Sequence, residues 1–132
     1  MERPPGKIAG CTALVRIQYV SSFCEVGNMA TVEVDAGICG MTSIIRASSE
    51  DGQLCSVSIE SPCDAIQALG EDIKEIDGFS AAFGNFDVNP VYKAAIAHYR
   101  HAACPVPSAI IKAVEVACGL ALPQDVNFQV EK

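Results

Sequence analysis

The sequence predicts an α+β domain: a three-stranded antiparallel sheet followed by three helices and a C-terminal strand. Two observations support this prediction. Between residues 31 and 60, apolar residues fall at alternating positions, interrupted by a glycine-rich turn and by an Asp-Gly pair, a pattern typical of strands joined by hairpins. After residue 61, apolar residues recur every three or four positions, which is typical of helices. A run of strands followed by a run of helices indicates the α+β class.

Three strands are expected before residue 61, over residues 31–35, 42–47 and 54–60. Asp51-Gly52 separates the second strand from the third, because this pair supplies the positive φ angles that a tight hairpin turn requires. The third strand alternates between apolar residues and polar or acidic ones. We therefore expect one face of the sheet to be buried and the other to face water.

Three helices are expected between residues 61 and 119. The first begins after Ser61 as N-cap, with a proline at its first position, and ends near Asp77. The second covers residues 90–99 and the third residues 107–119. Residues 79–88, with three phenylalanines, predict an irregular packed connection. The chain then finishes as a strand over residues 125–131, where apolar residues again fall at every second position.

Length and composition indicate one domain. A chain of 132 residues, half of them hydrophobic, is long enough for one core and too short for two. All expected elements fall within residues 29–132. Residues 1–28 contain an apolar stretch that lacks the uninterrupted centre and cleavage site of a signal peptide. We expect them to be either a disordered tail or a mis-annotated start, with translation beginning at Met29.

Composition also excludes several classes of function. The formal net charge is −7 and the nine basic residues form no cluster, so nucleic-acid binding is not expected. No apolar run approaches the roughly 18–20 residues of a membrane-spanning helix. Seven cysteines are an odd number that matches no small secreted disulfide framework. We therefore expect reduced thiols and a cytoplasmic protein.

Three of these cysteines lie at junctions between elements. Cys39 lies in a turn between Gly37 and Gly40. Cys63 follows a proline at the start of the first helix, and Cys104 precedes a Pro-Val-Pro segment at the start of the third. Thiols in loops and at helix starts are accessible to metals and to reagents. A hairpin turn, a strand-to-helix junction and a later helix start can converge at one end of such a sheet, so we expect these three thiols to form a site.

Three thiolates require a fourth ligand to complete a tetrahedral Zn²⁺ site or an iron–sulfur cluster site. His101, three residues before Cys104, is the first candidate, and His98 is the second. Asp35, four residues before Cys39, is a further candidate. The sequence does not choose between zinc and a cluster, because both accept thiolates and a nitrogen ligand.

The other thiols are expected to have a packing role. Cys55 lies in the middle of a predicted strand and Cys118 in the last turn of a predicted helix. Two alternatives to a metal site stay open: a metal-free thiol enzyme or sulfur carrier that uses Cys104 or Cys63, and a non-catalytic interaction domain. The chain has no CxxC pair, no phosphate-binding glycine loop and no GxSxG motif.

Three short segments resemble those of a known family, the U-type iron–sulfur cluster assembly scaffolds (IscU and the N-terminal domain of NifU). The segments are Ile38-Cys39-Gly40, Ser61-Pro62-Cys63-Asp64-Ala65-Ile66, and His101-Ala102-Ala103-Cys104 leading into Ala109-Ile110-Ile111-Lys112-Ala113. The resemblance covers about Val32 to Cys118. It implies a fold of the SufE/IscU type, with Cys39, Cys63 and Cys104 as cluster ligands. It also implies that a cysteine desulfurase or a cluster-accepting protein is the partner.

The chain departs from the family pattern at two positions. Met41 stands where the scaffolds have an aspartate, and His101 is separated from Cys104, whereas the scaffold histidine directly precedes its cysteine. The chain also resembles a group of short proteins from anaerobic bacteria and archaea with a similar Cys-Pro-Val-Pro-Ser ending, which implies no activity. We therefore expect a divergent scaffold or binding protein rather than an enzyme. A homodimer sharing one cluster would satisfy the ligand count equally well.

Overall fold

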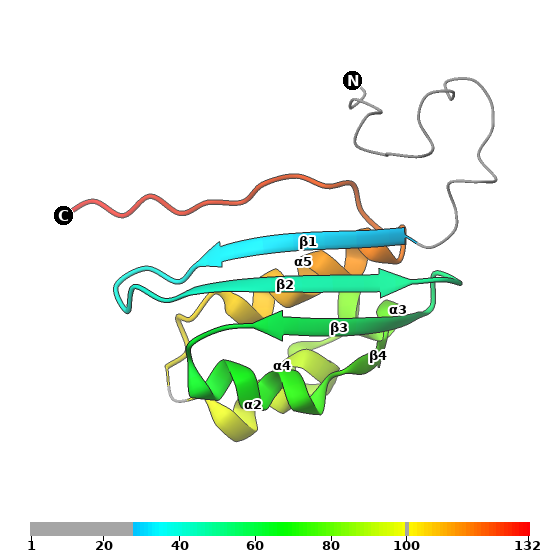
Figure 1. Ribbon diagram of the computed structural model, residues 1–132, viewed down its shortest axis with the longest axis horizontal. Coiled ribbons are helices and arrows are strands. Elements are labelled where there is room, and N and C mark those ends of the chain that lie inside the picture. The colour runs from blue at the N-terminus through cyan, green and yellow to red at the C-terminus, as the bar shows by residue number, and fades with distance from the viewer. Residues whose placement is uncertain (1–27, 100) are drawn as a thin grey trace.

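A computed structural model describes residues 28–99 and 101–132 and confirms the α+β class (Figure 1). Its sheet has four strands in the order β1-β2-β3-β4, each antiparallel to its neighbour. The strands are β1 (Asn28–Asp35), β2 (Thr42–Ser49), β3 (Leu54–Glu60) and β4 (Glu75–Asp77). The predicted tail, residues 1–28, lies outside the described residues except for Asn28, the first residue of β1.

The first three strands agree with the sequence prediction, but the fourth does not. The predicted C-terminal strand is wrong: residues 125–131 pair with no strand among the described residues. The fourth strand is instead β4, which pairs with the first half of β3, Cys55 opposite Ile76. The sequence did not predict β4 because a strand of three residues is too short to show a recognisable period. Residues 125–131 alternate but form no strand, because a strand also requires a neighbour that supplies hydrogen bonds.

The described residues also form four α-helices and a short 3₁₀ helix. They are α2 (Asp64–Asp72), α3 (Gly78–Ala82), η3 (Phe86–Val88), α4 (Pro90–His98) and α5 (Val106–Ala117). The first predicted helix therefore ends earlier than expected, and α3 and η3 occupy the segment predicted to be an irregular connection. That segment is also less packed than predicted, because Phe79, Phe83 and Phe86 are exposed.

The core lies between the sheet and helix α5, which packs across β1 and β2 on one face of the sheet (Figure 1). Val106, Ile110, Ala113, Val114 and Ala117 of α5 are completely buried. Helix α2 packs against β3 and α4. No helix in the described part of the chain is long and apolar enough to cross a membrane.

Asn89 fixes the start of α4 and ties it to α3. Its side-chain Oδ1 accepts hydrogen bonds from the N–H groups of Val91 and Tyr92, and its Nδ2 donates to the carbonyl of Ala81 at 2.8 Å. The sequence predicted this helix start from Asn89-Pro90. The second contact explains why the asparagine is buried rather than exposed like most caps.

Gly78 allows α3 to lie against the end of α5. A Cβ atom added at this buried glycine would lie 2.3 Å from the Cys118 Sγ and 3.2 Å from the Gln53 carbonyl oxygen. We expect Gly78→Ala to lower the free energy of unfolding by about 1–3 kcal/mol, the usual cost of overpacking a core. Urea unfolding followed by circular dichroism measures this change.

Gly70 of α2 provides the matched control. A Cβ atom there would meet Ile59 Cδ1 at 3.4 Å, which is ordinary contact. Because alanine favours a helix over glycine, Gly70→Ala should leave stability unchanged or raise it by up to about 1 kcal/mol. In a Cys118→Ala background, Gly78→Ala should cost less than in the native chain. An equal cost in both backgrounds would contradict the proposed clash.

Candidate functional site

The three junctions that carry Cys39, Cys63 and Cys104 lie at the same end of the sheet (Figure 1). The β1–β2 loop and the β3–α2 connection meet there because Ile44, near the start of β2, pairs with Glu60 at the end of β3. The Oγ atoms of Ser43 and Ser61 join the two segments at 2.9 Å. The chain returns to this end between α4 and α5.

Two of the thiols, those of Cys63 and Cys104, lie beside the hydroxyl group of Tyr99. Burial raises the pKa of Tyr99, and the Cys104 and Cys63 thiols beside it raise the pKa further. Among the described residues, the buried Tyr99 hydroxyl oxygen has no hydrogen-bond partner of ordinary geometry, although the Cys104 thiol lies close enough for a weak hydrogen bond. The structure therefore brings together two cysteines from distant parts of the sequence around an unsatisfied polar atom.

The backbone places Cys63 at the N-cap of α2, not at the second helical position that the sequence predicted. Its thiol makes no capping hydrogen bond, and its carbonyl accepts from the Gln67 N–H at 3.0 Å. The predicted N-cap, Ser61, instead accepts a hydrogen bond at Oγ from the Cys63 N–H. The first N–H groups of α2 thus have no side-chain acceptor among the residues that the structure describes. A helix start of this kind favours negative charge nearby.

Cys104 lies just before α5, where Pro105 is the N-cap and the helix begins at Val106. Both Cys63 and Cys104 are half-buried and contact the hydrophobic core. The two thiols therefore have a packing role at their inner side in addition to their position beside Tyr99.

Cys39 is exposed in the β1–β2 loop. Gly37 and Gly40, both with positive φ, shape the turn, and the Gly40 N–H donates to the Gly37 carbonyl at 2.8 Å. The neighbouring side chain of Ile38 is also fully exposed. This loop presents Cys39 to the solvent rather than to the other two thiols.

The predicted fourth ligands are less well placed. The carboxylate of Asp35 accepts a hydrogen bond from the Gly37 N–H at 3.1 Å, which gives it a role in the turn. His101 is exposed. His98 Nε2 lies 2.7 Å from the Asp72 carboxylate, so it joins the end of α4 to the end of α2.

The described residues contain no group of three or more His, Cys, Asp or Glu side chains already arranged to hold a metal ion. The structure places Cys63 and Cys104 near Tyr99 and the Cys39 loop at the same end of the sheet. His101 is exposed, and the Asp35 carboxylate is hydrogen-bonded within the turn. Sequence reasoning missed Tyr99. Its only signal was a residue with a polar tip at the end of a predicted helix, shortly before His101.

The other two described cysteines, Cys55 and Cys118, form a separate pair in the core, in agreement with their predicted packing role. Both are buried. Burial raises the pKa of the Cys55 thiol to about 12, and the neighbouring Cys118 adds to this rise. The Cys55 thiol is therefore neutral at physiological pH, and both thiols are shielded from solvent.

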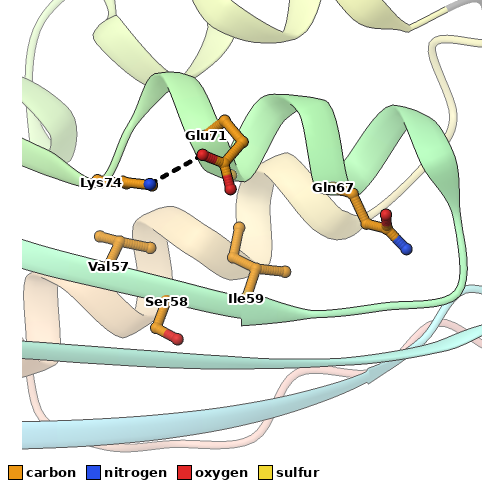
Figure 2. Close-up of a pocket in the computed structure, with 7 residues that line it drawn as sticks. Val57, Ser58, Ile59, Gln67, Glu71 and Lys74 are labelled. Carbon is orange, nitrogen blue, oxygen red and sulfur yellow. Dashed lines mark ion pairs between the residues drawn. The ribbon is translucent and has the colours of Figure 1, made fainter.

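A shallow hollow of about 400 Å³ lies away from the thiols, between β3 and α2 (Figure 2). It arises because β4 pairs only with the first half of β3, which leaves space beside Ser58 and Ile59. Gln67 and the ion pair between Lys74 and Glu71, 2.8 Å apart, line its helix side. No cysteine or histidine lines this hollow, so we place the candidate site at the thiols.

The chain belongs to a protein family whose members share most of its length. Residues 30–130 match the model of this family, which is described as "Family of unknown function (DUF6951)". No curated protein and no solved structure matches the chain. The family match includes all three junction cysteines and Tyr99.

Tyr99→Phe tests whether the buried hydroxyl lowers stability. A buried polar atom without a partner costs about 1–3 kcal/mol, so its removal should raise the free energy of unfolding by about 1 kcal/mol in urea unfolding. Tyr92→Phe is the control, because the exposed Tyr92 hydroxyl is hydrogen-bonded to Ser108 Oγ at 3.0 Å. The control should leave stability unchanged or lower it slightly. A clear loss of stability in Tyr99→Phe would show that the hydroxyl has a partner.

The raised pKa of Cys55 predicts a loss of stability at alkaline pH. The thiol titrates near pH 9.0 in the unfolded chain and near 12 in the folded protein. Protonation therefore stabilises the folded state fully below pH 9, and this contribution is lost as the pH rises from 9 towards 12. Urea unfolding across this range should show a falling free energy of unfolding. Cys55→Ala should make the fall shallower, whereas an unchanged slope would contradict the assignment.

Proposed function

We propose that this protein binds an iron–sulfur cluster or Zn²⁺ through Cys63, Cys104 and Cys39, and that it handles clusters or sulfur rather than turning over a metabolite. The observation that carries the proposal is the arrangement of the Cys63 and Cys104 thiols around the Tyr99 hydroxyl. Thiolates are the ligands that both zinc and iron–sulfur clusters favour. When bound, such a group would supply Lewis-acid or electron-accepting chemistry.

Cys63 and Cys104 form the fixed half of the proposed site. Each is held by backbone that also belongs to the core, Cys63 through the N-cap of α2 and Cys104 through the start of α5. The uncapped N–H groups at the start of α2 would favour the negative charge of a bound thiolate. The buried Tyr99 hydroxyl would donate a hydrogen bond to a sulfur atom at this place, because it has no other partner among the described residues.

Cys39 would complete the site from the β1–β2 loop. The loop lies at the same end of the sheet. A Cβ atom added at either of its two positive-φ glycines would meet no atom within 4 Å. Space around the loop therefore permits a different turn geometry in the loaded protein. Of the proposed fourth ligands, His101 fits this role better than Asp35, whose carboxylate already serves the turn.

The resemblance to the U-type scaffolds supports cluster handling and a cysteine desulfurase or cluster-accepting protein as partner. Exposure of Cys39 beside the exposed Ile38 side chain is consistent with a site that meets another protein. The net charge of −7 favours protein or metal partners over nucleic acid.

A metal-free thiol function is the second candidate. The described residues contain no three-ligand group ready for a metal, whereas two thiols already share one polar neighbour. In this case Cys104 or Cys63 would carry sulfur or act as a nucleophile, and the Tyr99 hydroxyl would hydrogen-bond the sulfur. A non-catalytic interaction domain is the reading in which neither thiol has a chemical role.

The first experiment measures iron, zinc and acid-labile sulfide, with an absorption spectrum, on the full chain purified without oxygen and without chelators. We expect bound metal close to stoichiometric amounts, lowered at least roughly tenfold by Cys63→Ser or Cys104→Ser, since each removes a ligand. Cys39→Ser should weaken binding similarly. Cys118→Ala is the control, because this thiol lies in the core, and it should retain the metal.

The remaining outcomes separate the alternatives. Absence of metal after reconstitution with zinc, and with iron plus sulfide, would contradict the proposal. If Cys63 or Cys104 then reacts with iodoacetamide much faster than the other cysteines, the thiol function replaces it. If every thiol reacts slowly and Cys→Ala at the three junctions changes nothing, the interaction domain replaces it.

A further inference from the structure

The last segment of the chain, residues 122–132, extends away from the folded domain, and we name it the C-terminal arm. The chain leaves α5 through hydrogen bonds from the Leu120 and Ala121 N–H groups to the Glu115 carbonyl. Beyond this point no residue of the arm makes a hydrogen bond to the rest of the described chain, and every one is exposed. Figure 1 shows the arm running along the outside of the sheet, past β1.

The arm has the sequence of a half-buried strand but none of the burial. Val126, Phe128 and Val130 alternate with polar residues and therefore share one face, and they are 62, 78 and 91% exposed. Leu122 is 87% exposed. A strand with one apolar face normally packs that face against a core. The family match continues to residue 130, so the arm belongs to the part of the chain that the family shares.

Strand β1 offers the unpaired edge that such an arm requires. Its eight residues pair with β2 on one side, and no described strand pairs with the other. Ala30 and Val32 point to the core side of the sheet but are only partly buried. A further strand beside β1 would satisfy its free N–H and C=O groups and cover these two side chains. Long open edges of this kind are the usual sites of strand addition.

The direction of the arm favours the β1 edge of a second copy over its own. In Figure 1 the arm and β1 run the same way, so pairing within one chain would add a parallel strand to an antiparallel sheet. A two-fold axis that is perpendicular to β1 and lies beside it reverses the partner chain, and the partner's arm then approaches β1 antiparallel. Antiparallel pairs are slightly more stable per residue.

We propose that the C-terminal arm of one copy adds as a strand to the β1 edge of a second copy, giving a symmetrical dimer in which the two chains exchange arms. Val126, Phe128 and Val130 lie against Ala30 and Val32 of the other copy and extend its buried face. The polar residues of the arm, among them Asn127 and Gln129, face water. This dimer does not depend on the proposed metal site.

Sedimentation velocity of the full chain over a range of concentrations tests the proposal. We expect the native chain to be a dimer. In Phe128→Asp the dissociation constant should rise at least roughly 100-fold, because the dimer has two arm contacts and the change places one charge in each of them. Gln129→Asp is the matched control, since it adds the same charge on the polar face, and it should remain dimeric. Circular dichroism should show both variants folded, because the arm lies outside the core.

Arm exchange is then read directly from a mixed sample of ¹⁵N-labelled and ¹³C-labelled chains. Contacts between residues 125–131 of one label and β1 of the other would confirm it. A monomer would overturn the proposal. This holds both if the arm amides are protected from hydrogen exchange, as they would be in an arm paired with β1 of its own chain, and if they exchange freely. A dimer that Phe128→Asp leaves intact would also overturn it, because the interface would lie elsewhere. Cys63→Ser should stay dimeric, which separates this inference from the metal site.

Discussion

The packing of helix α5 against one face of the sheet is the constraint on which the rest of the structure depends. Its completely buried stripe includes two alanines, Ala113 and Ala117, between larger residues, and small side chains let a helix approach a sheet closely. The helix contacts β1, β2 and β3. Because this contact fixes the helix along the sheet, it also fixes where the chain enters α5, and with it the position of Cys104.

The candidate site is a consequence of this arrangement combined with strand register. The pairing of β2 with β3 brings the Cys63 junction to the start of β2, where the Ser43–Ser61 hydrogen bond holds it. Helix α4 ends at His98, and Tyr99 follows as its C-cap with its N–H bonded to the Ala95 carbonyl. The packing of α5, the pairing of β2 with β3 and the end of α4 therefore fix the positions of Cys104, Cys63 and Tyr99, respectively. Cys39 is the exception, because its loop is shaped only by local turn hydrogen bonds.

Sequence patterns predicted those features that local physics determines. The strict alternation of residues 54–60 and the Asn89-Pro90 cap each correspond to a pattern a few residues long, and both elements are present. Strand β4 and the unpaired state of residues 125–131 were not predictable in this way. Each depends on pairing with a segment that is distant in sequence: β3 pairs with β4, whereas no described strand of the chain pairs with residues 125–131.

The same distinction applies to the site. The sequence predicted that Cys39, Cys63 and Cys104 would lie at one end of the sheet, because strand direction follows from the order of the elements. It did not predict which of them would meet, since side-chain contacts between segments far apart in sequence follow from packing. Thus Cys63 and Cys104 share Tyr99, whereas Asp35 serves the turn instead.

Tyr99 argues most strongly that these thiols do more than fill space. Packing alone would be satisfied by phenylalanine, which has the same ring and no buried hydroxyl. The hydroxyl costs free energy because it is buried without a partner of ordinary geometry among the described residues, and the two thiols near it are weak acceptors when neutral. A thiolate is a much better acceptor, and a sulfur atom that carries negative charge, whether bound to a metal or holding transferred sulfur, would accept the hydrogen bond that the folded chain leaves unmade. The proposed function accounts for the hydroxyl group and the two thiols together, because a bound or reacting sulfur atom would supply the acceptor that the hydroxyl group lacks among the described residues.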